Sequence, residues 1–242
     1  VVGIDGATWS VVDRNHTPNI DALKSRGLSG TLMAEEPLFS PLLWTTLATG
    51  RTPIDHGIQG TRTRTDLARV PRFWEILREA GLSVGLYKWL VTWPPPNGDI
   101  PGFTVPAWLA GDARTHPEDL SWVKALELSQ RMHRRRVETT RSVPQLLMEG
   151  LFDGLRWSTV SSGVRFVVVS SLMSTPKAQG EVFLRQLRLQ IDRDVFVHRL
   201  HRHEPDVATF TMYLTDALSH THWSSNEGQH VDEAYRLSDQ IL

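Results

Sequence analysis

The chain has 242 residues, 40% of them hydrophobic, which is enough apolar material for the core of one large domain or two smaller ones. Its formal net charge is −1, so nothing in the overall composition favours a nucleic acid polymer or an acidic membrane as a partner. Cysteine is absent, which excludes disulfides and thiolate metal sites, and no apolar run reaches the ~20 residues of a membrane span. The arginine clusters at 131–136 and 185–202 lie among acidic residues and are interpreted as solvated helix faces.

Strand and helix patterns alternate along most of the chain. Strands are predicted at 1–5, 28–34, 82–89 and 206–214, and helices at 17–27, 40–49, 71–80, 117–130, 143–157 and 176–203. A helix that is followed directly by a strand, as at 71–89, is typical of a parallel sheet. The stretch 164–169 is the one strand signal within an otherwise helical region.

The change in character along the chain predicts three segments. Residues 1–110 are expected to form the first part of an α/β core, 111–204 a mainly helical cap insertion, and 205–242 the return to the core. The chain opens on a strand pattern without a methionine and stops at Leu242 inside a helical pattern, so we expect a piece of a longer protein whose core is incomplete at the C-terminal side. No targeting signal can be read from such ends, and neither compartment nor oligomeric state follows from the sequence.

Ser40 and Pro41 together indicate the start of a helix. Serine is a frequent N-cap and proline is frequent in the first turn, and most such pairs serve only to begin the helix. The free N–H groups of a helix start also suit a phosphate, and beside a divalent cation the Ser40 hydroxyl could act as a nucleophile. Thr45 and Thr46 are alternative hydroxyls, but we expect them in the middle of the helix, without free N–H groups.

Two carboxylates follow predicted strands at opposite ends of the sequence. Asp5 ends the predicted strand at 1–5, after the apolar run Val1–Ile4, and Asp216 follows the predicted strand at 206–214. His220 comes four residues after Asp216, about one helical turn, so both side chains can face the same metal ion. The ends of parallel strands meet at one edge of a sheet, which predicts a single site there. The alternatives are a strand-terminating turn at Asp5 and a surface role for His220, while His222 is either a ligand or a residue behind the ligands.

Several motifs occur in the order found in one family of enzymes: Gly3-Ile-Asp5-Gly6, Thr17-Pro-Asn-Ile-Asp21, the run from Ser40-Pro41 to His56-Gly57-Ile58, and Asp216…His220-Thr-His-Trp223. The segments Phe73–Gly81 and Thr92–Gly98 agree as well. In these motifs the chain resembles the type I phosphodiesterase/nucleotide pyrophosphatase family of the alkaline phosphatase superfamily. The resemblance covers most of residues 1–110 and 206–242 and is weak between 120 and 204.

The resemblance implies a fold, an activity and a set of site residues. The fold is an α/β three-layer sandwich with a mostly parallel sheet and an inserted helical cap. The activity is hydrolysis of a small phosphoester, a phosphodiester or nucleotide pyrophosphate, through a phosphoserine at Ser40. Two divalent metal ions are implied, zinc first and manganese as the alternative. Asp5 and Ser40 would bind one of them, and Asp216 and His220 the other.

Two departures from the family pattern keep other functions open. Thr61 stands where an asparagine often helps to hold the phosphoryl oxygens, and Ser238-Asp-Gln240 lacks the histidine of an Asp-His metal pair. With fewer than three protein ligands a zinc site is incomplete, so this segment alone is expected to bind metal poorly and to be inactive. The alternatives are a non-catalytic module of the same fold used for binding, or a phosphomonoesterase or sulfatase relative. Ser40-Pro-Leu-Leu lacks the sulfatase pattern Cys/Ser-x-Pro-Ser-Arg.

Overall fold

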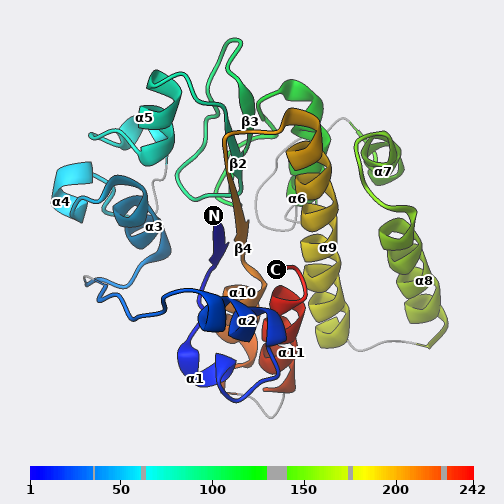
Figure 1. Cartoon of the computed structure of the whole chain (residues 1–242). Coiled ribbons are helices and arrows are strands. Elements are labelled where there is room, and N and C mark those ends of the chain that lie inside the picture. Colours follow the sequence, from blue (N-terminus) through cyan, green and yellow to red (C-terminus); the bar gives the residue numbers. More distant parts are fainter. Residues whose placement is uncertain (35, 61–63, 130–140, 174–176, 225–227) are drawn as a thin grey trace. The chain divides into compact units, whose positions relative to one another are not determined.

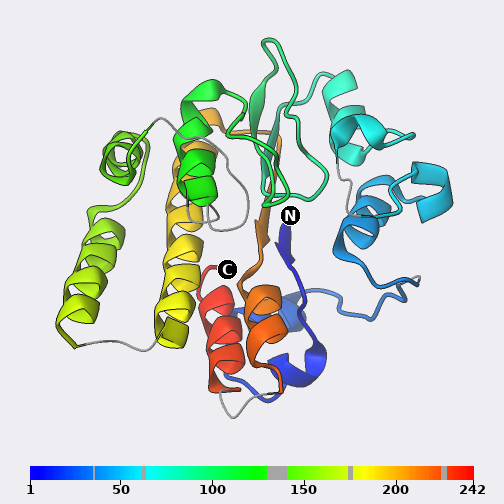
Figure 2. The same cartoon turned by 180° about the vertical axis from the view of Figure 1, so that it is seen from behind.

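The computed structural model describes residues 1–34, 36–60, 64–129, 141–173, 177–224 and 228–242, and Figures 1 and 2 show the course of the chain from two sides. The chain divides into two compact units. The first unit contains Val1, Met33–Leu155 and Val195–Phe210, and the second contains Val2–Leu32, Arg156–Asp194 and Thr211–Leu242. The predicted division into an α/β core and a cap over 111–204 uses other borders and remains a prediction.

The described residues contain one four-stranded sheet. Its strands are β1 (Val2–Ile4), β2 (Val84–Tyr87), β3 (Gly102–Val105) and β4 (Val207–Met212), in the order β1-β4-β2-β3. Val84 of β2 lies opposite Gly102 of β3 and Val207 of β4, and both pairings are parallel. β2 is buried along its whole length, as expected for an inner strand of a parallel sheet. The mixed α/β fold with a parallel sheet is therefore confirmed.

The first unit packs short helices around β2 and β3. They are α3 (Ser40–Thr49), α4 (Pro53–His56), α5 (Phe73–Glu79), α6 (Ser121–Ser129) and α7 (Val143–Phe152), with 3-10 turns at Thr65–Leu67 and Glu118–Leu120. An aromatic cluster of Trp44, Phe73, Trp74 and Trp89 joins α3 and α5 to the segment after β2, with edge-to-face ring contacts.

The second unit is built on helices from three parts of the sequence. They are α1 (Trp9–Val12), α2 (Pro18–Arg26), α8 (Trp157–Met173), α10 (Leu214–His222), α11 (Gln229–Asp239) and the first part of α9 (Lys177–His203), up to Asp194. Val11 and Val12 of α1 are buried against Val231 and Tyr235 of α11. This apolar contact joins the beginning of the chain to its last helix.

Asp239 completes the start of α2. Thr17 is the N-cap of α2 and Pro18 is its first residue, but the Thr17 side chain makes no capping hydrogen bond. The backbone N–H groups of Asn19 and Ile20 instead donate to the buried carboxylate of Asp239, at 3.2 and 2.7 Å. A carboxylate from a distant helix thus takes the capping role, which the sequence around Asp239 did not indicate.

Two predicted strands are wrong. Residues 28–34 form no strand, and Leu28, Leu32 and Met33 are exposed, so the apolar pattern there has no sheet partner to satisfy its backbone. Residues 164–169 lie inside helix α8. A short run of β-branched residues fits either structure, and the helix on both sides of it decides the outcome. The strand β3 was not predicted from the sequence.

Candidate functional site

Ser40 is the first residue of α3, with Pro41 directly after it. The predicted N-cap is wrong, because Phe39 has the extended backbone of the cap and Ser40 is already helical. The expected row of free N–H groups is also reduced. Pro41 has no N–H group, and the amides of Leu42 and Leu43 both donate to the carbonyl of Phe39. At this end of the helix the polar side chain is that of Ser40, whose hydroxyl is half-buried.

Helix α3 contacts Trp89 within the first unit and ends at Gly50. The indole N–H of Trp89 donates to the carbonyl oxygen of Trp44 at 3.2 Å, and the two rings meet edge to face with centroids 4.9 Å apart. Gly50 ends the helix in the left-handed conformation with φ 63°. The helix whose first turn carries Ser40 is therefore held at Trp44 by Trp89.

His56 connects α3 to the loop that follows it. The imidazole is fully buried, and its Nδ1 accepts a hydrogen bond from the backbone N–H of Ile58 at 3.1 Å. Its proton therefore lies on Nε2, which is 3.2 Å from the hydroxyl of Thr46 and donates to it. Both Thr45 and Thr46 are inside the helix, and Thr45 donates to the Pro41 carbonyl. These hydroxyls are thus engaged in holding the helix and its loop.

Asp216 and His220 lie in helix α10 of the second unit. The helix begins two residues after β4 ends, so Asp216 stands in its first turn, where a carboxylate is favoured by the helix dipole. The imidazole Nε2 of His220 is 3.3 Å from a carboxylate oxygen of Asp216. The side chain of Asp216 is 27% exposed and that of His220 is 77% exposed. The pair therefore shares one face of the helix and is accessible from solvent.

Asp5 is brought to the same end of the second unit. Its backbone N–H donates to the Met212 carbonyl at 2.9 Å, and its carbonyl accepts a hydrogen bond from the Thr215 hydroxyl at 2.5 Å. Gly6 then passes so close to α10 that a Cβ atom there would lie 2.8 Å from the Cα of Asp216. The two acidic segments, far apart in the sequence, are therefore adjacent, and the Asp5 side chain is buried.

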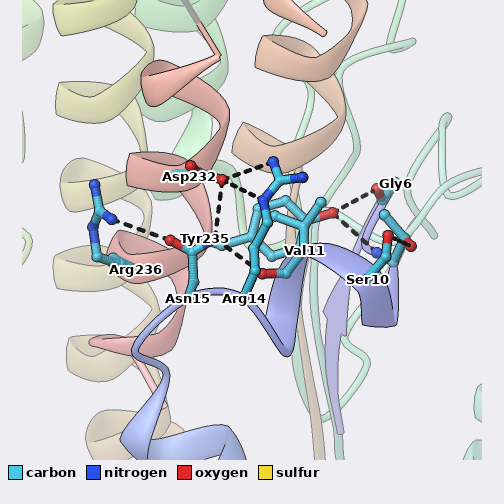
Figure 3. A network of polar contacts seen from close by, with 9 residues as sticks. Gly6, Ser10, Val11, Arg14, Asn15, Asp232, Tyr235 and Arg236 are labelled. Carbon is cyan, nitrogen blue, oxygen red and sulfur yellow. Dashed lines mark hydrogen bonds and ion pairs between the residues drawn. The ribbon is translucent and has the colours of Figure 1, made fainter.

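Tyr235 holds the loop that follows Asp5 (Figure 3). Its hydroxyl accepts a hydrogen bond from the Thr8 N–H at 2.9 Å and donates one to the Gly6 carbonyl at 3.3 Å. Burial raises the pKa of the Tyr235 phenol, so the hydroxyl keeps the proton that it donates. Beside it, Arg14 and Asn15 both donate to the carboxylate of Asp232. Sequence reasoning missed Tyr235, whose only signal was a place on the apolar face of the last helix.

His222 and Thr61 are the two residues that were predicted to lie behind the metal ligands. His222 is buried and lies on a different face of α10 from Asp216 and His220, with its ring centroid 5.1 Å from that of His230 in α11. Thr61 lies outside the described residues. Ser40 belongs to the first unit, whereas Asp5, Asp216 and His220 belong to the second.

Asp216 and His220 are two described side chains that could bind a metal ion. Asp216 and His220 offer one carboxylate and one imidazole, which are suitable ligands for zinc or manganese. Within the described ranges, no group of three or more Asp, Glu or His side chains is arranged to hold a metal ion. The pair thus provides part of a metal site.

A parallel α/β sheet with acidic residues after two of its strands is consistent with the alkaline-phosphatase-like fold. The sequence model of the type I phosphodiesterase/nucleotide pyrophosphatase family matches residues 1–242, and the chain belongs to this family. Family membership indicates phosphoester hydrolysis. A comparison with curated proteins gave no match, and none of the described helices is long and apolar enough to cross a membrane.

Proposed function

We propose that the protein hydrolyses a small phosphodiester or nucleotide pyrophosphate through a phosphoserine at Ser40, with the help of two divalent metal ions, zinc or manganese. The observation that carries the proposal is the meeting of Asp5 and Gly6 with the first turn of α10, which brings two acidic strand ends of this family's sequence together. The position of Ser40 at the start of a firmly held helix supports its role as the nucleophile.

In this proposal each residue has a defined task. Asp216 and His220 hold one metal ion, and Asp5 and Ser40 contribute to the other. When bound, the ions lower the pKa of a coordinated hydroxyl and neutralise charge on the transferring phosphoryl group. Tyr235 and Gly6 keep Asp5 beside α10. The contacts of Trp89 with Trp44 hold α3, the helix whose first turn carries Ser40.

The reaction has two balanced steps. First, the Ser40 Oγ loses its proton and forms a bond to phosphorus, while the bond from phosphorus to the leaving-group oxygen breaks and that oxygen takes up a proton. Second, water attacks phosphorus, the bond to Ser40 Oγ breaks, and the serine hydroxyl is restored. The products are an alcohol or a phosphate from the leaving group, and a phosphomonoester or nucleotide.

The test is turnover of bis-p-nitrophenyl phosphate by the full-length protein with zinc or manganese. Ser40→Ala should lower kcat by about 10³-fold or more, and acid quenching of the wild type should trap phosphate on the Ser40 peptide, as detected by mass spectrometry. Thr46→Ala is the matched control, because it removes another α3 hydroxyl and should leave phosphate trapping intact.

Two outcomes would contradict the proposal. Normal turnover by Ser40→Ala would exclude Ser40 as the nucleophile, and turnover unchanged by a chelator would exclude the metal ions. A wild-type protein that is inactive with either metal would favour a non-catalytic binding module, which agrees with the two-ligand Asp216–His220 pair.

A further inference from the structure

A second polar site lies in the second unit, on residues that the proposed hydrolysis does not use. A cavity of about 260 Å³ is bounded by the start of α8, one face of α9 and the end of α11. Figures 1 and 2 show α8 beside α9, and the stacked rings of Phe166 and Phe183, with centroids 3.9 Å apart, join these two helices. The polar residues that line the cavity are Arg156, Ser158, Thr159, Gln186, Gln190, Arg193, Asp194 and Gln240.

The carboxylate of Asp194 accepts hydrogen bonds from the start of α8, and two arginine side chains lie near it. Its buried carboxylate accepts hydrogen bonds from the Thr159 hydroxyl at 2.6 Å and from the Arg156 backbone N–H at 3.2 Å. The guanidinium groups of Arg156 and Arg193 lie 3.5 and 3.8 Å from its other oxygen, beyond the usual length of a hydrogen bond. Two positive charges therefore share one negative charge, and most of their N–H groups remain available to a ligand.

Helix α9 also contributes uncharged hydrogen-bond donors, the side-chain amides of Gln186 and Gln190, to the lining of the cavity. Gln186, Gln190 and Arg193 are spaced four and three residues apart, so they lie on one side of the helix. Within the described part of the chain, the side-chain amides of Gln186, Gln190 and Gln240 have no protein hydrogen-bond partner. A ligand in the cavity would meet guanidinium and amide N–H groups together.

We infer that this cavity binds a small phosphate-bearing molecule, with Arg156 and Arg193 holding its oxygens. The forked guanidinium group matches the paired oxygens of phosphate, and the excess positive charge offsets the charge of the ligand. The cavity volume is below that of most drug-sized ligand sites, which limits the ligand to a small molecule.

The test is equilibrium dialysis of radiolabelled inorganic phosphate against the full-length protein in the presence of a chelator. The parent for all measurements carries Asp216→Asn, which disables the proposed hydrolytic site and so separates the two proposals. Arg193→Gln should weaken phosphate binding by about 10-fold or more, since it removes charge-assisted hydrogen bonds. Arg202→Gln, the same charge change at an exposed position of the same helix, should leave binding unchanged.

Arg156→Gln provides a second variant should Arg193→Gln fail to fold, because the Arg156 side chain is 56% exposed. The inference would be overturned by a parent that binds no phosphate, or by equal losses in Arg193→Gln and Arg202→Gln. Acetate that competes as well as phosphate would also overturn it and would identify a carboxylate site.

Discussion

Helices α3 and α10 carry the two groups of predicted site residues, and they are held in different ways. α3 contacts the ring of Trp89 through Trp44, accepts a hydrogen bond from the Trp89 indole at the Trp44 carbonyl, and ends at Gly50 in the left-handed conformation. α10 is approached closely at its first turn by the backbone of Gly6, and its Asp216–His220 face is exposed.

The proposed function gives the two helices different tasks. A nucleophile needs one fixed direction of attack, and the contact between Trp44 and Trp89 helps to hold α3 in place. Ligands for a cation must remain accessible and polar. α10 leaves Asp216 and His220 accessible, while Leu218 is buried and Gly6, in the loop that Tyr235 holds, lies against its first turn. Three predictions test this contrast.

The largest effect is expected for Gly6→Ala. Gly6 has φ 67°, and an added Cβ would meet the backbone of Asp216 at 2.8 Å, so both conformational strain and a clash are introduced. We expect the free energy of unfolding to fall by about 2–4 kcal/mol, measured by urea denaturation. Gly50→Ala is the matched control, because Gly50 has φ 63° and open space around the added Cβ. Equal losses in the two variants would show that the close approach of Gly6 to α10 is unimportant.

A smaller effect is expected for Trp89→Phe. The substitution keeps an aromatic ring in the cluster but removes the hydrogen bond to the Trp44 carbonyl, and should cost about 1–2 kcal/mol. Because Trp89 orients α3, kcat of the full-length protein should fall more than in Trp74→Phe, a control that trims another ring of the same cluster. If the two variants have the same kcat, the hydrogen bond to α3 does not position Ser40.

The smallest effect is a pH dependence that arises at Asp232. Burial raises the pKa of this carboxyl, but the hydrogen bonds from Asn15 and Arg14, together with the charges of Arg14 and Arg236, outweigh burial and lower the pKa below its usual value. A lowered folded-state pKa stabilises the protein above the unfolded-state pKa, and this contribution is lost as the pH falls through the folded-state value.

Asp232→Asn should therefore cost a few tenths to about 1 kcal/mol at neutral pH, with the difference from wild type vanishing in acid. Urea denaturation at pH 7 and at pH 2 measures this. A difference that persists at pH 2 would show that the Asp232 contacts act through something other than charge.

Much of the local structure could be predicted from residue patterns. The strands at both ends of the chain, the helix that begins at Ser40, and the one-turn spacing of Asp216 and His220 all follow from short-range periodicity and helix-start residues. The prediction failed where a local pattern fitted two structures, as in residues 164–169, or where an apolar strand pattern found no partner, as in residues 28–34.

The sequence by itself determined the family, the chemistry of the candidate residues and their positions on strands and helices, because these depend on residue types and on spacings within a few turns. Tertiary structure alone decided that Gly6 meets Asp216, that Tyr235 holds the loop after Asp5, that Asp239 caps α2, and that two arginines share Asp194. The physical reason is that these contacts join residues distant in sequence, whose approach is set by packing of whole helices rather than by any local preference.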